Sequence, residues 1–131
     1  MKKNLDKILT EISAGELIDK ITILEIKNEK ISNTDKLIDI KKELTSLKKS
    51  YEKNIPLNRE LNALTKELKK INLKLWDIEE KKRLAEKNNK FDNQFIQLAR
   101  DVYKFNDRRA KIKLQINVIL GSNIREVKSY Y

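Results

Sequence analysis

Apolar residues recur along this chain at alternating intervals of three and four, which places them on one face of a helix. The clearest run lies in the middle of the chain: Leu61, Leu64, Leu68, Ile71, Leu75 and Ile78. A second run lies just upstream: Leu37, Ile40, Leu44, Leu47 and Tyr51. Such stripes are the seams along which helices pack side by side in a coiled-coil manner. The pattern therefore predicts an all-α protein.

Capping and helix-breaking residues divide the chain into four predicted helices. Ser13 and Glu16 form a capping box at the start of the first helix. Pro56 cannot continue a helix interior, and Gly121 suits the left-handed position just past a helix end. Short polar stretches supply the remaining breaks. The predicted helices span about residues 14–31, 35–53, 57–87 and 92–120.

These helices are expected to form a single domain over residues 1–131, with an N-terminal arm (1–12) and a C-terminal tail (122–131). At about 1.5 Å per residue, the third and fourth helices are each over about 40 Å long, so their hairpin is expected to form the spine. The short link at Pro56 also predicts that the second and third helices are antiparallel neighbours. We therefore expect a four-helix bundle with a long antiparallel coiled-coil-like hairpin.

Composition excludes several kinds of chemistry. The chain has no cysteine and no histidine, which excludes disulfides, thiol nucleophiles and zinc sites built from thiolate or imidazole. It also lacks the commonest general base at neutral pH. Its two glycines are too few for a glycine-rich phosphate loop. We therefore expect no metal and no cofactor, and the composition argues against an enzyme without excluding one.

Hydropathy and the N-terminal residues indicate where in the cell the protein is expected to be. No apolar run approaches the roughly 18 to 20 residues that span a bilayer, so no membrane span is expected. The first four residues are too polar for a signal peptide. These two features predict a cytoplasmic protein.

The formal net charge of +10 raises the question of nucleic-acid binding. The excess is spread along the chain, and no recognisable docking motif accompanies it. Lysine pairs such as Lys41-Lys42 and Lys69-Lys70 are expected to lie on solvated helix faces. Nucleic acid is therefore the least favoured of the partners considered.

Several polar residues interrupt the predicted apolar faces. On a helical wheel, Glu25 falls among the aliphatic residues of the first helix. Asn106 falls near the middle of the apolar face of the fourth helix, and Arg109 and Lys113 follow one and two turns later. A buried charge without a partner costs several kcal/mol or more. We therefore expect Glu25 to pair with Arg109, with Asn106 as a bridge and the Tyr103 hydroxyl nearby.

Three interpretations of this polar set stay open. In the first interpretation, the set is a structural network that fixes helix register, as a buried asparagine does in coiled coils. In the second, it is a small interhelical pocket in which Arg109, Lys113 and Asn106 hold an anionic ligand. In the third interpretation, the wheel is misphased and these residues face water.

Leu73 and Trp76 form a second apolar patch on the third helix, roughly across from its main stripe. A large indole on the outer face of a helical hairpin is unusual, and exposed apolar patches mark contact surfaces. The patch is therefore expected to pack against another helix of the monomer or to form an interface with a second subunit.

Four segments carry recognisable motifs. They read G-E-L-I-D-K from Gly15, L-W-D from Leu75, N-D-R-R from Asn106 and L-G-S-N from Leu120. Together they resemble a small bacterial family of unknown function, whose members carry similar G-E-L-x-D-K, L-W-D and N-D-R-R blocks. The resemblance implies a bacterial, cytoplasmic protein and no particular activity. It also draws attention to further residues: Gly15, Glu16, Asp19, Lys20, Glu25, Trp76, Asp77 and Asn106 to Arg109.

The favoured function is a non-enzymatic protein-interaction or assembly module that binds another protein or itself as a homo-oligomer. The first alternative is an all-helical binder or enzyme for a small anionic metabolite, in which Arg109 and Lys113 would position carboxylates or phosphates. The second alternative is nucleic-acid binding through a basic helix face.

Overall fold

The computed structural model describes residues 4–129, so the first three residues of the predicted arm and the last two of the predicted tail lie outside it. Within this range the chain forms four helices and no strand. They are α1 (Ala14–Lys30), α2 (Thr34–Asn54), α3 (Arg59–Lys87) and α4 (Asn93–Leu120). The prediction of an all-α four-helix bundle is confirmed, and the helix boundaries nearly coincide with the predicted ones.

Side-chain caps explain where the helices begin and end. The Ser13 hydroxyl accepts a hydrogen bond from the Glu16 amide at 3.1 Å, which is one half of the predicted capping box, while the Glu16 carboxylate pairs with Lys113 and Lys20 instead. Side chains that cap the other three helices in the same way are Asn33, Asn58 and Asp92. Gly121 closes α4 with a φ of 62°, the left-handed conformation that glycine adopts most easily. The sequence therefore encodes the element boundaries locally.

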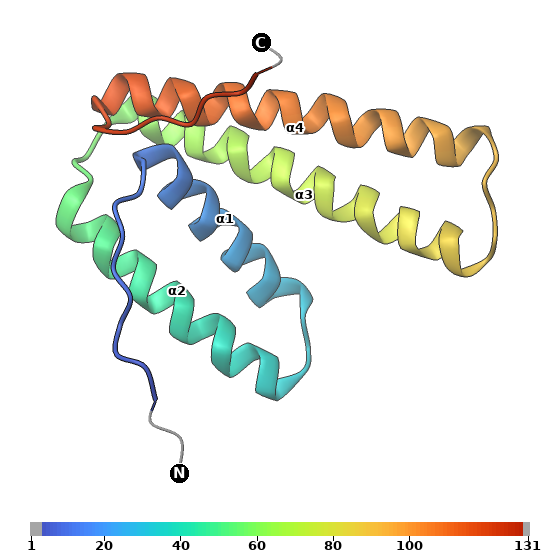
Figure 1. Cartoon of the computed structure of the whole chain (residues 1–131), viewed down its shortest axis with the longest axis horizontal. Coiled ribbons are helices and arrows are strands. Elements are labelled where there is room, and N and C mark those ends of the chain that lie inside the picture. Colours follow the sequence, from blue (N-terminus) through green and yellow to red (C-terminus); the bar gives the residue numbers. More distant parts are fainter. Residues whose placement is uncertain (1–3, 130–131) are drawn as a thin grey trace.

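The helices form two antiparallel hairpins, α1–α2 and α3–α4, with α1 between α2 and the long α3–α4 hairpin (Figure 1). Helix α1 packs against all three other helices, whereas the backbone of α2 lies close to α1 alone and only side chains near its C-terminal end reach the second hairpin. The prediction that α2 and α3 are antiparallel neighbours is therefore wrong. The physical reason is that α1 carries apolar residues on two sides and lies between them.

Two hydrophobic clusters hold the hairpins together, and α1 contributes to both. The first joins α1 to α2: Leu17, Ile21, Leu24, Ile40 and Leu44. The second joins α1 to α3 and α4: Ile18, Leu61, Leu68, Ile112 and Ile116. Tyr51 and Ile55, near the end of α2, pack against both clusters. Each fully buried aliphatic side chain stabilises the fold by about 1.5–3 kcal/mol, so α1 is the main structural element of the core.

The α3–α4 hairpin extends beyond the end of α1 (Figure 1). Helix α3 has 29 residues and α1 has 17, a difference in length of about 18 Å. Apolar side chains stay exposed in the outer half of the hairpin: Leu84, Phe91, Ile96 and Tyr103. None of the described helices is long and apolar enough to cross a membrane.

Candidate functional site

The first turn of α1 lies directly against α4. The Gly15 amide donates a 2.7 Å hydrogen bond to Oδ1 of the buried Asn117, and the Ala14 amide donates to the Ser122 hydroxyl at 3.0 Å. A Cβ atom on Gly15 would lie only 2.5 Å from the backbone oxygen of Lys113. Glycine therefore permits the close approach of the two helices that brings their charged residues together.

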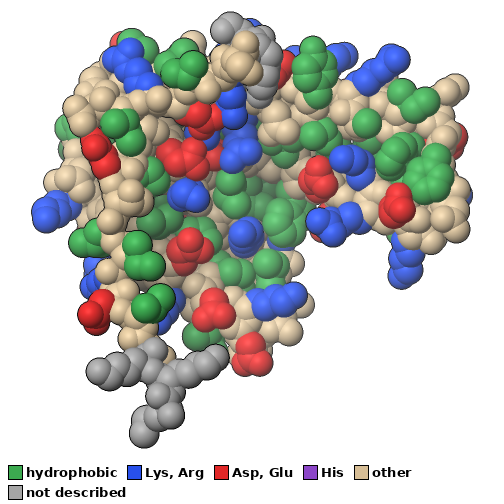
Figure 2. Space-filling model, in the orientation of Figure 1, with side chains coloured by type: hydrophobic (Ala, Val, Ile, Leu, Met, Phe, Trp, Pro, Cys, Tyr) green, Lys and Arg blue, Asp and Glu red, His purple; other side chains and the backbone are tan. Residues whose placement is uncertain are grey.

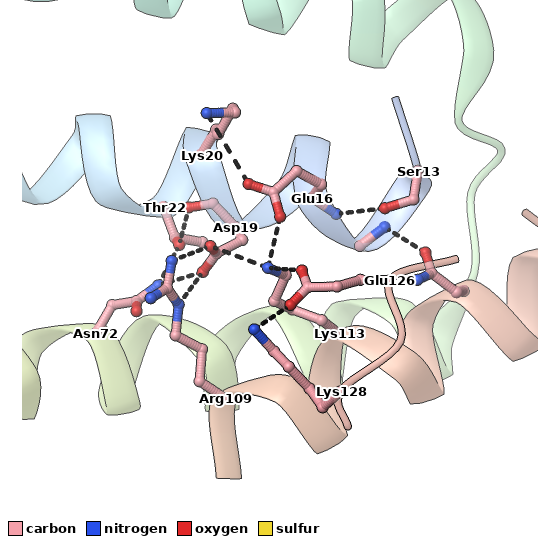
Figure 3. A network of polar contacts seen from close by, with 12 residues as sticks. Ser13, Glu16, Asp19, Lys20, Thr22, Asn72, Arg109, Lys113, Glu126 and Lys128 are labelled. Atoms are coloured by element: carbon pink, nitrogen blue, oxygen red, sulfur yellow. Dashed lines mark hydrogen bonds and ion pairs between the residues drawn. The ribbon is translucent and has the colours of Figure 1, made fainter. Parts of the chain in front are cut away.

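Asp19 is the centre of a buried polar network beneath this contact (Figure 3). It is fully buried, with an exposed fraction of 0%. Arg109 binds it in a bidentate manner, with Nε donating to Oδ1 at 3.0 Å and Nη2 donating to Oδ2. Asn72 of α3 donates to Oδ1 at 2.9 Å. A buried carboxylate is thus matched by a planar cation and an amide, the arrangement that offsets its desolvation.

Thr22 completes the hydrogen bonding around Asp19. Its hydroxyl donates to the Asp19 backbone oxygen at 2.8 Å and accepts a 2.8 Å hydrogen bond from the Asn72 amide. The network therefore joins three helices: Asp19 and Thr22 lie on α1, Asn72 on α3 and Arg109 on α4. Polar groups satisfied in this way fix the register of helices that apolar contacts alone would let slide.

Lys113 forms the second half of the network, one turn along α4 (Figure 3). Its ammonium nitrogen lies 2.5 Å from Glu16 Oε2, 3.0 Å from Glu126 Oε2 and 3.8 Å from Asp19 Oδ2. Burial by itself lowers the pKa of Lys113, but the hydrogen bonds to Glu16 and Glu126 outweigh it and raise the pKa. The hydrogen bond to Asp19 raises the pKa of Arg109 against the effect of burial. Both cations therefore stay charged.

Glu126 ties the C-terminal tail to this network. Lys128 and Lys113 both form ion pairs with it, and these hydrogen bonds lower the pKa of Glu126 below its ordinary value of 4.5. A carboxyl group whose pKa is lowered by folding stabilises the folded state above its unfolded pKa, and this stabilisation is lost as the pH falls through the folded pKa.

Replacing Glu126 with glutamine is therefore expected to lower the melting temperature slightly at neutral pH, because the carboxylate is partly exposed. The difference from the wild type should shrink as the pH falls below about 4.5, because Glu126 is protonated first in the unfolded state and then, at its lowered pKa, in the folded state. Thermal unfolding from pH 7 to pH 3 measures this. Glu43→Gln, a substitution on the exposed face of α2, serves as the control for loss of one negative charge. A Glu126→Gln difference that is constant across this range would contradict the expected linkage.

The structure brings together two of the five residues predicted for the polar set. Arg109 and Lys113 lie side by side above Asp19. Glu25 does not pair with Arg109, because Asp19 occupies that position, and it lies 3.9 Å from Lys69 of α3 instead. Asn106 and Tyr103 are exposed, so the predicted apolar face of α4 is rotated toward solvent relative to the observed one.

The helical wheel did not include Asp19, the carboxylate at the centre of the network, in the polar set, although the family resemblance drew attention to it. A single apolar stripe was assumed for α1, and on that assumption Asp19 falls on the solvated side. The buried residues of α1 instead cover two sides of the helix: Gly15, Leu17, Ile18, Asp19, Ile21, Thr22, Leu24 and Ile26. The available signal was that Asp19 and Thr22 are two of only four polar residues in the segment 17–26, which otherwise consists of isoleucine and leucine.

A cleft opens next to Arg109, between the second half of α1 and the α3–α4 hairpin. It has a volume of about 590 Å³, and its lining includes Ile23 and Ile26 of α1 and Leu75 and Trp76 of α3. Figure 2 shows hydrophobic side chains in the hollow between α1 and this hairpin. The Trp76 indole donates to Glu80 at 3.0 Å. We call this the Trp76 cleft.

The charged groups around the Trp76 cleft are of both signs. Its lining also contains Glu79, Glu80, Arg83, Asn106 and Arg109. Leu73, the other residue of the predicted patch, is half-buried beside Trp76 on α3. Among residues 4–129, no group of three or more acidic side chains is placed to hold a metal ion. The cleft thus combines an apolar floor with a polar rim, as contact sites for proteins do.

Comparison with known proteins gives one result. Neither the curated proteins nor the solved structures include a significant match to this chain. A protein-family model described as "Family of unknown function (DUF6165)" matches residues 8–131, nearly the whole sequence. This confirms the resemblance inferred from the motifs, and the chain belongs to the DUF6165 family of unknown function.

Proposed function

We propose that this protein is a non-enzymatic protein-interaction or assembly module, and that its docking site is the Trp76 cleft. The observation that carries the proposal is the half-buried indole of Trp76 in a cleft of about 590 Å³ with aliphatic walls. Tryptophan and arginine are the side chains that contribute most to protein–protein contacts, and the cleft contains Trp76, Arg83 and Arg109. A cytoplasmic location and a bacterial origin are part of this proposal.

The shape of the site favours a helix as its occupant. Helix α1 diverges from the α3–α4 hairpin toward its C-terminal end (Figure 1), and the Trp76 cleft lies between the two, lined by Ile23 and Ile26 of α1 and by residues of α3 and α4. A partner helix inserted between α1 and the hairpin would extend the helix-on-helix packing of the core. Its apolar side would contact Leu75 and Trp76, and its polar side would meet the charged rim.

The chemistry of Arg109 and Lys113 lends less support to an anionic metabolite. Both cations already have carboxylate partners within the chain, namely Asp19, Glu16 and Glu126. The carboxylate oxygens of Glu16 and Asp19 lie 2.5 and 3.8 Å from the Lys113 ammonium nitrogen, so an anionic ligand would have to compete with them. The polar set is therefore better explained as the support that fixes α1 against α4, with the Trp76 cleft beside it.

Site-specific photo-crosslinking in the native host cell tests the proposal. A benzoylphenylalanine in place of Arg83, an exposed residue of the cleft rim, is expected to give a discrete protein adduct after irradiation. The same group in place of Lys49, on the exposed face of α2, is the matched control. An adduct at position 83 that is weakened by Trp76→Ala supports the cleft as a docking site. Equal or absent crosslinking at both positions would refute it.

A further inference from the structure

We propose that the occupant of the Trp76 cleft is the N-terminal arm of a second copy of this chain, folded into a short amphipathic helix. This inference rests on the proposed function, and it names the partner. The inference rests on two features of the same chain: an open cleft with apolar walls, and an exposed N-terminal segment whose apolar residues have helical spacing.

The arm has the sequence pattern of a helix and the structure of an extended segment. Leu5, Ile8, Leu9 and Ile12 follow the spacing i, i+3, i+4 and i+7, which puts all four on one face of a helix. Residues 4–13 form no regular structure, and the exposed fractions of these four residues are 86%, 81%, 88% and 37%. In the monomer, Leu5, Ile8 and Leu9 therefore stay almost fully exposed, and only Ile12, next to α1, is partly covered.

Capping residues for such a helix are also present. Asn4 is a favourable N-cap residue for a helix that begins at Leu5, and Asp6 places a negative charge in its first turn. An isolated helix of this length is not stable in water, so the arm would become helical only on docking. This accounts for a helical pattern in a segment that lacks helical structure.

The geometry of the chain excludes docking of a helical arm into its own cleft. A helix from Leu5 to Ile12 is about 12 Å long and joins α1 directly at Ser13. The cleft begins about 15 Å further along α1, at Ile23. The arm also leaves Ser13 across α2, away from the α3–α4 hairpin (Figure 1). An extended arm would be long enough to reach the cleft of its own chain, but its four apolar residues would then no longer share one face.

The arm of a second copy is not limited by this short connection to α1, and its docking would bury both the apolar side of the arm and the apolar walls of the cleft. In a two-fold dimer each arm would occupy the partner's cleft, so the contact is made twice and no open chain of subunits results. The polar residues agree with this placement. The arm helix carries Asp6, Lys7 and Glu11, and the cleft rim carries both acidic and basic groups: Glu79, Glu80, Arg83 and Arg109.

The first test is the oligomeric state of the purified full-length chain. Light scattering across a concentration series is expected to give a dimer of twice the 15.5 kDa chain mass. The double variant Ile8→Asp/Leu9→Asp should be a monomer that keeps the circular dichroism of the four helices, because both residues are exposed in the monomer, and loses only the small helical contribution of the docked arm. Lys7→Gln, on the polar side of the same arm, should dimerise like the wild type. A strict monomer, or a dimer that survives Ile8→Asp/Leu9→Asp, would overturn the inference.

The second test uses Trp76, the only tryptophan in the chain, as a probe of the cleft. A synthetic peptide of residues 1–13, added to the Ile8→Asp/Leu9→Asp protein, is expected to shift the Trp76 emission to shorter wavelength and to become helical. The same peptide carrying both aspartates should do neither. An unchanged Trp76 emission with the wild-type peptide would overturn the inference.

The crosslinking experiment at Arg83 separates this inference from the proposed function. An adduct of two copies that is lost with Ile8→Asp/Leu9→Asp supports both. An adduct that contains a different protein refutes the arm as occupant and leaves the cleft as a docking site. No adduct above the Lys49 control refutes both.

Discussion

Replacing Asp19 with asparagine is expected to lower the free energy of unfolding by about 3–5 kcal/mol, the range measured when one partner of a buried ion pair is removed. Asp19 is fully buried, and its charge balances Arg109 and Lys113, which lie within hydrogen-bond or ion-pair distance. The asparagine has the same shape but no charge, so both cations lose their closest common counter-charge. Urea unfolding of the variant and the wild type measures the difference.

Two controls accompany this prediction. Asp39→Asn, on the exposed face of α2, should change the free energy of unfolding by less than about 0.5 kcal/mol. The double substitution Asp19→Leu/Arg109→Leu should recover part of the loss, because it removes the buried charge together with its partner. An Asp19→Asn protein as stable as Asp39→Asn would show that this network contributes little to folding.

Replacing Gly15 with alanine is expected to destabilise the protein by about 2–4 kcal/mol, from a steric clash and a weakened hydrogen bond. In an ordinary helix interior the same substitution stabilises by about 0.5–1 kcal/mol, so the expected sign is reversed. The new Cβ would lie 2.5 Å from the Lys113 backbone oxygen, and a backbone atom cannot rotate away as a side chain can. Helices α1 and α4 must therefore separate, which also lengthens the bond from Gly15 to Asn117.

Gly121→Ala provides the comparison for the Gly15 substitution. Its added Cβ meets no atom within 4 Å, so the only cost is the left-handed φ of 62°, about 1–2 kcal/mol. Thermal or urea unfolding should therefore rank the wild type first, Gly121→Ala second and Gly15→Ala last. A Gly15→Ala variant more stable than the wild type would rule out the close α1–α4 contact.

The sequence predicted those features that depend on neighbouring residues. The N-cap at Ser13, the break at Pro56 and the left-handed Gly121 are local signals, and the structure agrees with each. The predicted α2–α3 pair was wrong, because which helices become neighbours depends on how many sides of α1 are apolar. A helical wheel on which each helix has one buried side cannot represent a helix that has two buried sides.

The candidate site was predicted less well, for a related reason. Arg109 and Lys113 were identified because they interrupt an apolar helix, and they do meet acidic partners. Their partner Asp19 comes from a helix whose second buried side was not recognised, and Glu126 comes from a tail without periodicity. The ion pairs that join α1 to α4 link residues 90 and 97 positions apart, which no local pattern encodes.

The contacts at the start of α1 also set an order for folding during synthesis. The backbone amides of Ala14 and Gly15 bond to Ser122 and Asn117, partners 108 and 102 residues later in the chain. The α1–α2 and α3–α4 hairpins need only nearby residues, so each can assemble as soon as it leaves the ribosome. Helix α1 is therefore synthesised first but is the last to be fixed in place. A nascent chain that ends before Ser122 lacks the hydrogen bond that joins Ala14 to this residue.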